Sequence, residues 1–427
     1  MIALTLFSTL LIFLLLRVPI AAALGLSTAL AVLQADLPLT LIVQRMVVSN
    51  DSFPLMAIPF FILAGNVMTY GGVSRRIVAF ADTLVGWMTG GLGLVATVSG
   101  VFFSAISGSS AATTAAVGSV LFPEMEKRGY DRSFSAAIVA AAGETGIIIP
   151  PSVVMVVYGV IAGVSIGDMF LGGFGPGLLM GFSMTVLIYV LSRKKGLQST
   201  SKFVGFKQVI KSFSSAIWGL MMPVIILGGI YGGIFTPTEA AVVAVLWGIF
   251  VGFFIYKDLK AADLPKILRK SAIGAAVIMF IMNAAGLFSW IITSEQIPHK
   301  LAQSFVAISG GSEIIFLMLI NVLLLITGTM INASAAITIL APILVPVAMT
   351  FNIDLVFFGV LMVVNMAIGC ITPPVGVDLF VATTISGVPI EKIAKAIFPF
   401  LVVLIVDLIL ITYVQDIIMW LPNMFGG

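Results

Sequence analysis

The chain is dominated by long apolar runs, separated by short segments rich in polar residues, glycine and proline. A helix needs about 20 apolar residues to cross a bilayer, and roughly a dozen stretches reach this length. They extend from Leu4–Leu33 to Ala396–Leu421. Such long, uninterrupted runs exclude the alternating pattern of a membrane β-barrel. We therefore expect an all-α polytopic membrane protein, whose first membrane helix is retained and kinked at Pro19.

Two of the apolar runs contain the same signature, Gly-x-Ile-x-Pro-Pro, at Gly146–Pro151 and Gly369–Pro374. A shift of 223 positions aligns the two signatures and also aligns Pro123 with Pro346. The chain therefore carries an internal duplication. Because proline lacks an amide hydrogen and clashes with the preceding helical turn, each signature predicts a broken membrane helix. Two broken helices in corresponding halves are typical of a secondary transporter with its binding site between repeats.

The run before each signature is too polar at its centre for a plain membrane span. Gly91–Phe122 has serine, glycine and threonine in its middle, and its partner Ile314–Val345 has a similar centre. Irregular backbone at membrane depth is tolerated where it is buried in protein or lines a cavity. We therefore predict two re-entrant hairpins, each made of two half-helices that meet at a polar tip.

Basic residues predict that the two repeats are inverted. The loops over residues 193–211 and 257–270 are the richest in lysine and arginine, and such loops stay in the cytoplasm. Loop Pro123–Arg132 contains three basic residues, whereas its partner Pro346–Asp354 contains none. Beyond the broken helices the asymmetry reverses, as an inverted repeat requires.

These patterns divide the chain into five parts. We expect scaffold helices of the first repeat in residues 1–90, its transport elements in 91–170, scaffold and connecting helices in 171–290, the transport elements of the second repeat in 291–395, and a C-terminal membrane helix in 396–427.

Composition supports this class and excludes others. The chain is 60% hydrophobic and 9% charged, with a mean hydropathy of +1.21, so the lipid bilayer must cover its surface. The net charge of +3 indicates topology and no nucleic-acid partner. One cysteine and one histidine provide neither a disulfide nor a zinc or copper site. A membrane hydrolase would need a Ser/His/Asp or metal cluster, and His299 lies far from the serine-rich centre, so we expect no enzyme.

The prolines also predict ion sites. Pro150 and Pro151 cannot donate hydrogen bonds to the carbonyl oxygens four residues earlier, those of Gly146 and Ile147. The same reasoning applies to Gly369 and Cys370 in the second signature. Na⁺ is a hard ion that accepts such oxygen ligands without a carboxylate. We predict a first Na⁺ site from Ser107, Ser109, Gly146, Ile149 and Pro151, and a second from Gly328, Asn332, Gly369, Thr372 and Pro374.

A bound anion is expected beside these ions. Half-helices that begin after the breaks point their partly positive amino termini toward the midplane of the membrane. The candidates for binding a carboxylated substrate are Ser109, Ser110, Asn332 and Ser334. Glu144 is an ionisable group in a membrane segment, but its counterpart is Ala367, so a structural or tuning role is the alternative to direct function.

Several short motifs occur together in a fixed order along the chain. They are Ser107-Gly-Ser-Ser-Ala111, Glu126-Lys-Arg-Gly-Tyr130, Ile149-Pro-Pro-Ser152, Phe235-Thr-Pro-Thr-Glu-Ala240 and Thr372-Pro-Pro-Val-Gly376. With these motifs, nearly the whole chain resembles the large membrane subunit of tripartite ATP-independent periplasmic (TRAP) transporters. Asn332 and Asp378 depart from the pattern, since relatives often have an acidic residue at the first position and an asparagine at the second.

The resemblance implies Na⁺-driven import of an organic acid by an elevator mechanism across the bacterial inner membrane. It implies two protein partners, a small four-helix membrane subunit and a periplasmic substrate-binding protein. Substrates in the family include C4-dicarboxylates, sialic acids and other sugar or keto acids. The extra amino-terminal helices of fused versions are missing, so the small subunit is expected to be a separate chain. Two alternatives within transport stay open: a stand-alone Na⁺/dicarboxylate symporter, which would need no partner, and a passive channel.

Overall fold

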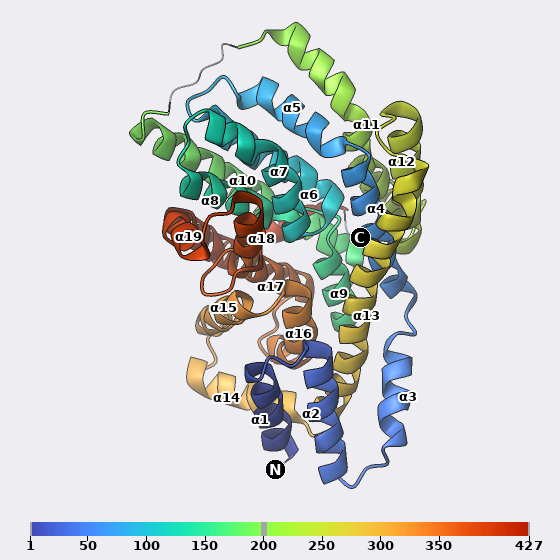
Figure 1. Ribbon diagram of the computed structural model, residues 1–427. Coiled ribbons are helices and arrows are strands. Elements are labelled where there is room, and N and C mark those ends of the chain that lie inside the picture. Colours follow the sequence, from blue (N-terminus) through green and yellow to red (C-terminus); the bar gives the residue numbers. More distant parts are fainter. Residues whose placement is uncertain (1, 198–202, 426–427) are drawn as a thin grey trace.

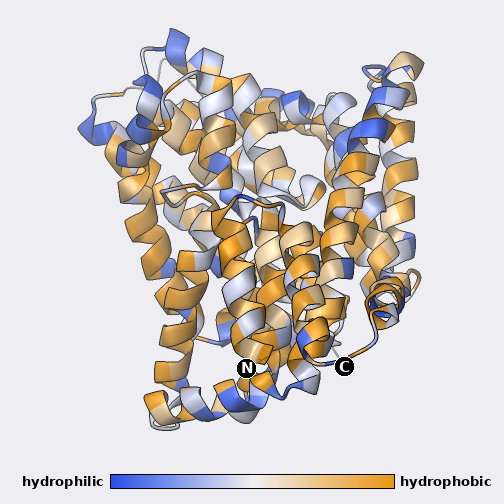
Figure 2. Ribbon diagram, turned by 60° about the horizontal axis from the view of Figure 1, so that its bottom comes forward, coloured by the Kyte–Doolittle hydropathy of each residue, from blue (hydrophilic) through white to orange (hydrophobic). Residues whose placement is uncertain are grey.

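The computed structural model describes residues 2–197 and 203–425, and within them the protein is entirely helical (Figure 1). Residues 198–202 of the predicted basic loop lie outside the described residues. Eight helices in the described part are long and apolar enough to cross a membrane. Hydrophilic residues gather at the two ends of the molecule, and hydrophobic residues form the broad belt between them (Figure 2). This distribution confirms the polytopic α-helical class.

The amino-terminal apolar stretch folds into two helices, α1 (Ile2–Leu15) and α2 (Ile20–Gln34). The prediction of one helix kinked at Pro19 is therefore wrong. Arg17 adopts a left-handed conformation with φ of 61°, and the amide of Val18 closes the turn on the carbonyl of Phe13 at 3.0 Å. Pro19 then precedes the first residue of α2, where its fixed φ suits a helix start.

The connecting segment between the repeats contains a helical hairpin of α11 (Phe206–Tyr231) and α12 (Pro237–Phe250), and a π-helical turn over Val251–Ile255 extends α12. The turn is fixed by a capping box, in which Thr236 and Glu239 satisfy each other's backbone amides.

The duplication recurs in the helix bounds. Four helices of the first half match four helices of the second half after the 223-residue shift. The pairs are α6 (Gly91–Ser107) with α15 (Glu313–Met330), α7 (Ser110–Lys127) with α16 (Ala333–Thr350), α8 (Arg132–Gly143) with α17 (Leu355–Cys370), and α9 (Val153–Ala162) with α18 (Val377–Ser386). Asp131 and Asp354, which the shift also aligns, cap α8 and α17 with their side chains. Both predicted hairpins are therefore present as helix pairs, and a break interrupts the helix at both predicted places. That the hairpins re-enter the membrane stays a prediction.

The remaining elements surround these eight. They are α3 (Thr40–Ser49), a 3₁₀ turn at Phe53–Met56, α4 (Ala57–Tyr70), α5 (Val73–Val85), α10 (Ile166–Lys194), a 3₁₀ turn at Ala261–Asp263, α13 (Leu264–Ser294), α14 (Ile297–Ser309), α19 (Ile390–Tyr413) and α20 (Asp416–Phe425). The expected boundaries at residues 170, 290 and 395 fall inside α10, α13 and α19.

The two sets of four helices contact each other reciprocally. Arg132, at the start of α8, donates to the carbonyl of Ser386, at the end of α18, over 2.7 Å. Tyr158 of α9 donates to the carbonyl of Leu355, at the start of α17, over 2.8 Å. In Figure 1, α18 lies beside α7 and α8, while α9 lies beside α16 and α17. The beginning of one broken helix therefore lies near the far end of the other.

Candidate functional site

The first hairpin turns within two residues. Gly108 ends α6 in the left-handed conformation, with φ of 62°, which costs glycine nothing. Ser109 is extended, and its side chain accepts a hydrogen bond from the amide of Ala112, so it is the N-cap of α7. Gly108 is thus the C-cap of α6, and the next residue, Ser109, is the N-cap of α7.

Hydroxyl groups gather behind this tip. The hydroxyls of Ser107 and Thr113 lie 2.7 Å apart. Both lie within hydrogen-bonding distance of the Ser109 carbonyl oxygen, Ser107 at 3.2 Å and Thr113 at 3.0 Å. A neighbouring pair, Ser104 and Thr145, lies 2.8 Å apart and ties α6 to the broken helix. The tip therefore presents several neutral oxygen atoms.

The first helix break begins where α8 ends, at Gly143. A 3₁₀ turn covers Glu144–Ile147, and α9 begins at Val153 after the Pro150-Pro151 pair, whose peptide bond is cis. Ser152 caps α9 and also donates its hydroxyl to the Ile147 carbonyl at 2.6 Å. The prediction that this carbonyl is left without a donor is therefore wrong, because a serine next to the prolines replaces the missing amide.

The tip and the break meet through glycines. A Cβ atom on Gly146 would lie 2.6 Å from the Ser109 carbonyl oxygen and 2.7 Å from the Thr113 hydroxyl oxygen. A Cβ atom on Gly108 would lie 2.8 Å from the Pro151 carbonyl oxygen. The structure thus brings Ser107, Ser109, Gly146 and Pro151 together. The side chain of Ile149 packs against Gly177 of α10, and the role of its backbone oxygen as a ligand stays a prediction.

The second tip and break meet in the same way. Asn332 caps α16 by accepting from the amide of Ser334 at 3.0 Å. A Cβ atom on Gly369 would lie 2.5 Å from the Cα of Gly328, and the amide of Gly376 donates to the carbonyl of Thr329 at 3.2 Å. The hairpin backbone therefore rests directly on the broken-helix backbone.

The second break also satisfies carbonyls that proline was expected to leave free. The Gly369 carbonyl accepts from the amide of Thr372 at 3.0 Å, so the prediction for this carbonyl is wrong. The Thr372 hydroxyl donates to the carbonyl of Ile368 at 2.6 Å. Pro374 follows, again after a cis peptide bond. The chain turns so sharply here that the amide and hydroxyl of Thr372 donate to carbonyl oxygens of the preceding helix.

Ser110 connects the two halves. It is the first residue of α7, is buried, and lies close to the thiol of Cys370 at the end of α17. It also lies close to the carboxyl group of Asp378 in the first turn of α18, outside hydrogen-bond geometry. The other predicted substrate residues are placed differently, since Asn332 caps its own helix and Ser334 follows it as a buried residue of the first turn.

Three carboxyl groups lie in this interior. Glu144 and Asp378 are fully buried, and none of their carboxyl oxygens has a hydrogen-bond partner among the described residues. Asp407 of α19 accepts from Ser183 of α10 at 2.9 Å through one oxygen. An ionised carboxylate buried without a partner is costly, so Glu144 and Asp378 require either a proton or a bound cation.

Sequence reasoning missed the hydroxyls of Ser104, Thr113 and Thr145. One signal was available: Thr113 lies four residues after Ser109, the spacing at which a threonine bonds back to a helical carbonyl. The Ser104–Thr145 pair joins residues 41 positions apart, and no local pattern predicts it.

Known proteins resemble this chain over nearly its whole length. The family described as "Tripartite ATP-independent periplasmic transporter, DctM component" matches residues 7–417. The C4-dicarboxylate TRAP transporter large permease protein of Pseudomonas aeruginosa is 45% identical over 406 residues, which are 95% of this chain and 94% of that protein. The isethionate TRAP transporter permease protein DctMQ of Oleidesulfovibrio alaskensis is 44% identical over 417 residues, 97% of this chain and 65% of that protein.

A solved structure has the same fold. The YdaH transporter of Alcanivorax borkumensis superimposes with a TM-score of 0.67 at 17% identity, covering 98% of this chain and 99% of that chain. The relatives are named as permeases and not as enzymes, and the apolar spans agree with a multi-pass protein of the inner membrane. The chain belongs to the DctM family, the large membrane components of tripartite ATP-independent periplasmic transporters.

Proposed function

We propose that this protein imports an organic acid by Na⁺-coupled secondary transport, through an elevator motion of α6–α9 and α15–α18 against the other helices. One observation supports this proposal above all. In each half, a hairpin tip and a proline-broken helix meet backbone to backbone, at Ser109 and Gly146 and again at Gly328 and Gly369. Irregular backbone that meets inside a membrane protein is where transporters coordinate ions and substrate.

The chemistry of the meeting points favours Na⁺. The oxygens at the first point come from hydroxyl groups and carbonyls, those of Ser107, Thr113, Ser109 and Pro151. Neutral oxygens suit a hard monovalent cation, which loses little by exchanging water for them. We place one ion at each meeting point, with the residues predicted above and with Thr113 added to the first site.

The substrate is proposed to be a small organic anion held between the tips. Relatives are named for C4-dicarboxylate and isethionate, which are both small organic anions. Ser110 begins α7 next to the first tip and lies near Cys370 at the second break. Neighbouring Na⁺ ions and the amino termini of α7 and α16 would supply the positive charge.

The protein is proposed to work with a small membrane subunit and a periplasmic binding protein, as its family does. The longer Oleidesulfovibrio relative, of which this chain covers 65%, fits a small subunit fused to the large one.

Reconstitution into liposomes tests the proposal. Uptake of a radiolabelled acid chosen from a ligand screen of the binding protein should require an inward Na⁺ gradient, the small subunit and the binding protein together. Uptake by this chain alone would instead indicate a stand-alone symporter. Flux that continues after the Na⁺ gradient is removed would indicate a channel.

A further inference from the structure

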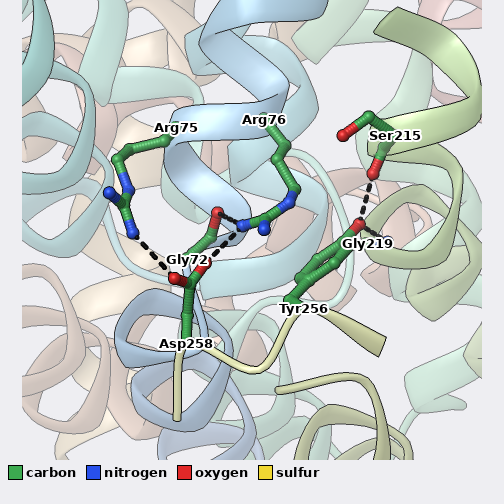
Figure 3. A network of polar contacts seen from close by, with 7 residues as sticks. All are labelled: Gly72, Arg75, Arg76, Ser215, Gly219, Tyr256 and Asp258. Carbon is green, nitrogen blue, oxygen red and sulfur yellow. Dashed lines mark hydrogen bonds and ion pairs between the residues drawn. The ribbon is translucent and has the colours of Figure 1, made fainter. Parts of the chain in front are cut away.

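A pocket of about 310 Å³ lies outside the transport elements, between α5, α11 and the turn that joins α12 to α13. Figure 3 shows the polar network at its floor. Its lining combines two guanidinium groups, one carboxylate and two hydroxyl-bearing residues: Arg75, Arg76, Ala79, Ser212, Ser215 and Asp258.

The floor of the pocket is held in place by several contacts. Arg76 contacts Asp258 at 2.6 Å, donates to the carbonyl of Gly72 at 2.9 Å, and stacks 3.8 Å above the ring centroid of Tyr256. The Tyr256 hydroxyl in turn donates to the carbonyl of Ser215 on α11 at 2.7 Å. Arg76 is therefore fixed between a carboxylate and an aromatic ring.

Arg75 is different. Its side chain is 68% exposed, and among the described residues its guanidinium pairs only with the second oxygen of Asp258, at 3.2 Å. Two guanidiniums therefore share one carboxylate, which leaves the pocket with a net charge of +1 from Arg75, Arg76 and Asp258. A planar guanidinium with free donors pairs well with the oxygens of a phosphate group.

The surroundings suit a lipid. The adjoining turn and the start of α13 carry Lys257, Lys260, Lys266, Arg269 and Lys270, so this end of the molecule is predicted to face the cytoplasm. On α11, close in sequence to the pocket-lining serines, Ile210 is 67% exposed and Phe213 is 42% exposed. A basic pocket at the cytoplasmic surface, next to exposed apolar side chains, matches a phosphorylated headgroup with its acyl chains.

We propose that this pocket binds the headgroup phosphate of an anionic phospholipid, with Arg75 as the main contact and the lipid chains lying along α11. The bound lipid would bridge α5 and α11, two helices outside the transport elements.

Native mass spectrometry of the purified full-length protein tests this proposal. The protein is exchanged into detergent with equal amounts of phosphatidylglycerol and phosphatidylcholine, and the retained lipids are counted. Arg75→Gln should retain about fivefold less phosphatidylglycerol, since one basic residue near a membrane surface contributes about that factor. Arg269→Gln is the matched control, because Arg269 is exposed at the same end but does not line the pocket.

Thermal unfolding in detergent separates a lipid from a free anion. Short-chain phosphatidylglycerol should stabilise the wild type and Arg269→Gln but not Arg75→Gln, and inorganic phosphate at the same concentration should stabilise none of them. Equal retention of phosphatidylglycerol by all three proteins would overturn the proposal. So would stabilisation by inorganic phosphate as large as that by the lipid.

Discussion

At the first hairpin tip, single side chains determine which oxygens are available to an ion. The Thr113 hydroxyl lies 2.7 Å from the Ser107 hydroxyl and 3.0 Å from the Ser109 carbonyl oxygen, so it contacts two of the proposed ligands. Removing this hydroxyl removes one oxygen and loosens the two others. The hydroxyl is therefore a sensitive position for testing the first site.

We predict that Thr113→Val raises the Na⁺ concentration for half-maximal uptake about fivefold, because a lost polar contact costs on the order of 1 kcal/mol. Valine keeps the shape of threonine, so the amount of protein in the membrane should be unchanged. Uptake in proteoliposomes over a Na⁺ series measures the effect.

Thr185→Val in α10 is the matched control, because the one partner of the Thr185 hydroxyl among the described residues is the Gly181 carbonyl of its own helix, at 2.7 Å. If both variants require the same Na⁺ concentration as the wild type, Thr113 does not belong to an ion site.

Sequence reasoning at this scale found the serines of the tip but not their partners. Ser107 and Ser109 were predictable because glycine and serine in an apolar run indicate a turn and a cap. The donors to Ile147 and Gly369 were not, because they depend on how tightly the chain bends after each proline pair. A proline removes one donor, but the neighbouring residues decide whether another replaces it.

At the scale of elements, glycines set the distance between each hairpin and its broken helix. Gly328 of α15 and Gly369 of α17 approach so closely that a Cβ atom on Gly369 would lie 2.5 Å from one backbone atom and 2.6 Å from another. The backbone atoms of Gly328 cannot avoid this clash by changing rotamer, as a side chain could. Any larger residue must therefore separate the two helices.

We predict that Gly369→Ala destabilises the protein by about 1–3 kcal/mol, as overpacking does, and abolishes most Na⁺-dependent uptake. Thermal unfolding in detergent and uptake in proteoliposomes measure the two effects.

Gly228→Ala in α11 is the control, since no described atom outside the adjoining backbone of α11 lies within 4 Å of the added Cβ and alanine favours a helix. It should leave uptake unchanged and leave stability equal or slightly higher. A Gly369→Ala protein that behaves like this control would show that the contact is not needed.

The elements themselves were largely predictable. Both breaks, both hairpins and the α11–α12 turn follow from proline, glycine and capping residues, which act within a few positions of the chain. The amino-terminal stretch was not predicted correctly, because Arg17 carries the turn in a left-handed conformation for which arginine gives no signal. A proline at a helix start and a proline in a kink look alike in sequence.

At the scale of the whole molecule, basic residues and contacts agree on orientation. Arg132 reaches Ser386, so segments 123–132 and 387–395, which both contain basic residues, lie at the same end of the molecule. Segment 346–354 contains none and adjoins Leu355, which Tyr158 contacts from α9. This arrangement supports the proposed inversion of the second repeat.

We predict that Lys127→Cys is cytoplasmic and Thr350→Cys periplasmic, each made in a Cys370→Ala background. Cys370 is the sole cysteine and is buried, so its removal leaves a low labelling background. A membrane-impermeant maleimide added to intact spheroplasts should label Thr350→Cys and spare Lys127→Cys. Inside-out vesicles should give the reverse result, and labelling of both positions from the same side would contradict the inversion.

The reciprocal ties between the halves carry one further consequence. The ring of Tyr158 covers Gly359, its hydroxyl holds the first turn of α17, and Arg132 anchors the far end of α18. A shift of either broken helix would therefore disturb its contacts with the other. Na⁺ bound in one half would therefore favour the ion-binding arrangement of the other half. Uptake would then rise more steeply with Na⁺ concentration than two independent sites would give.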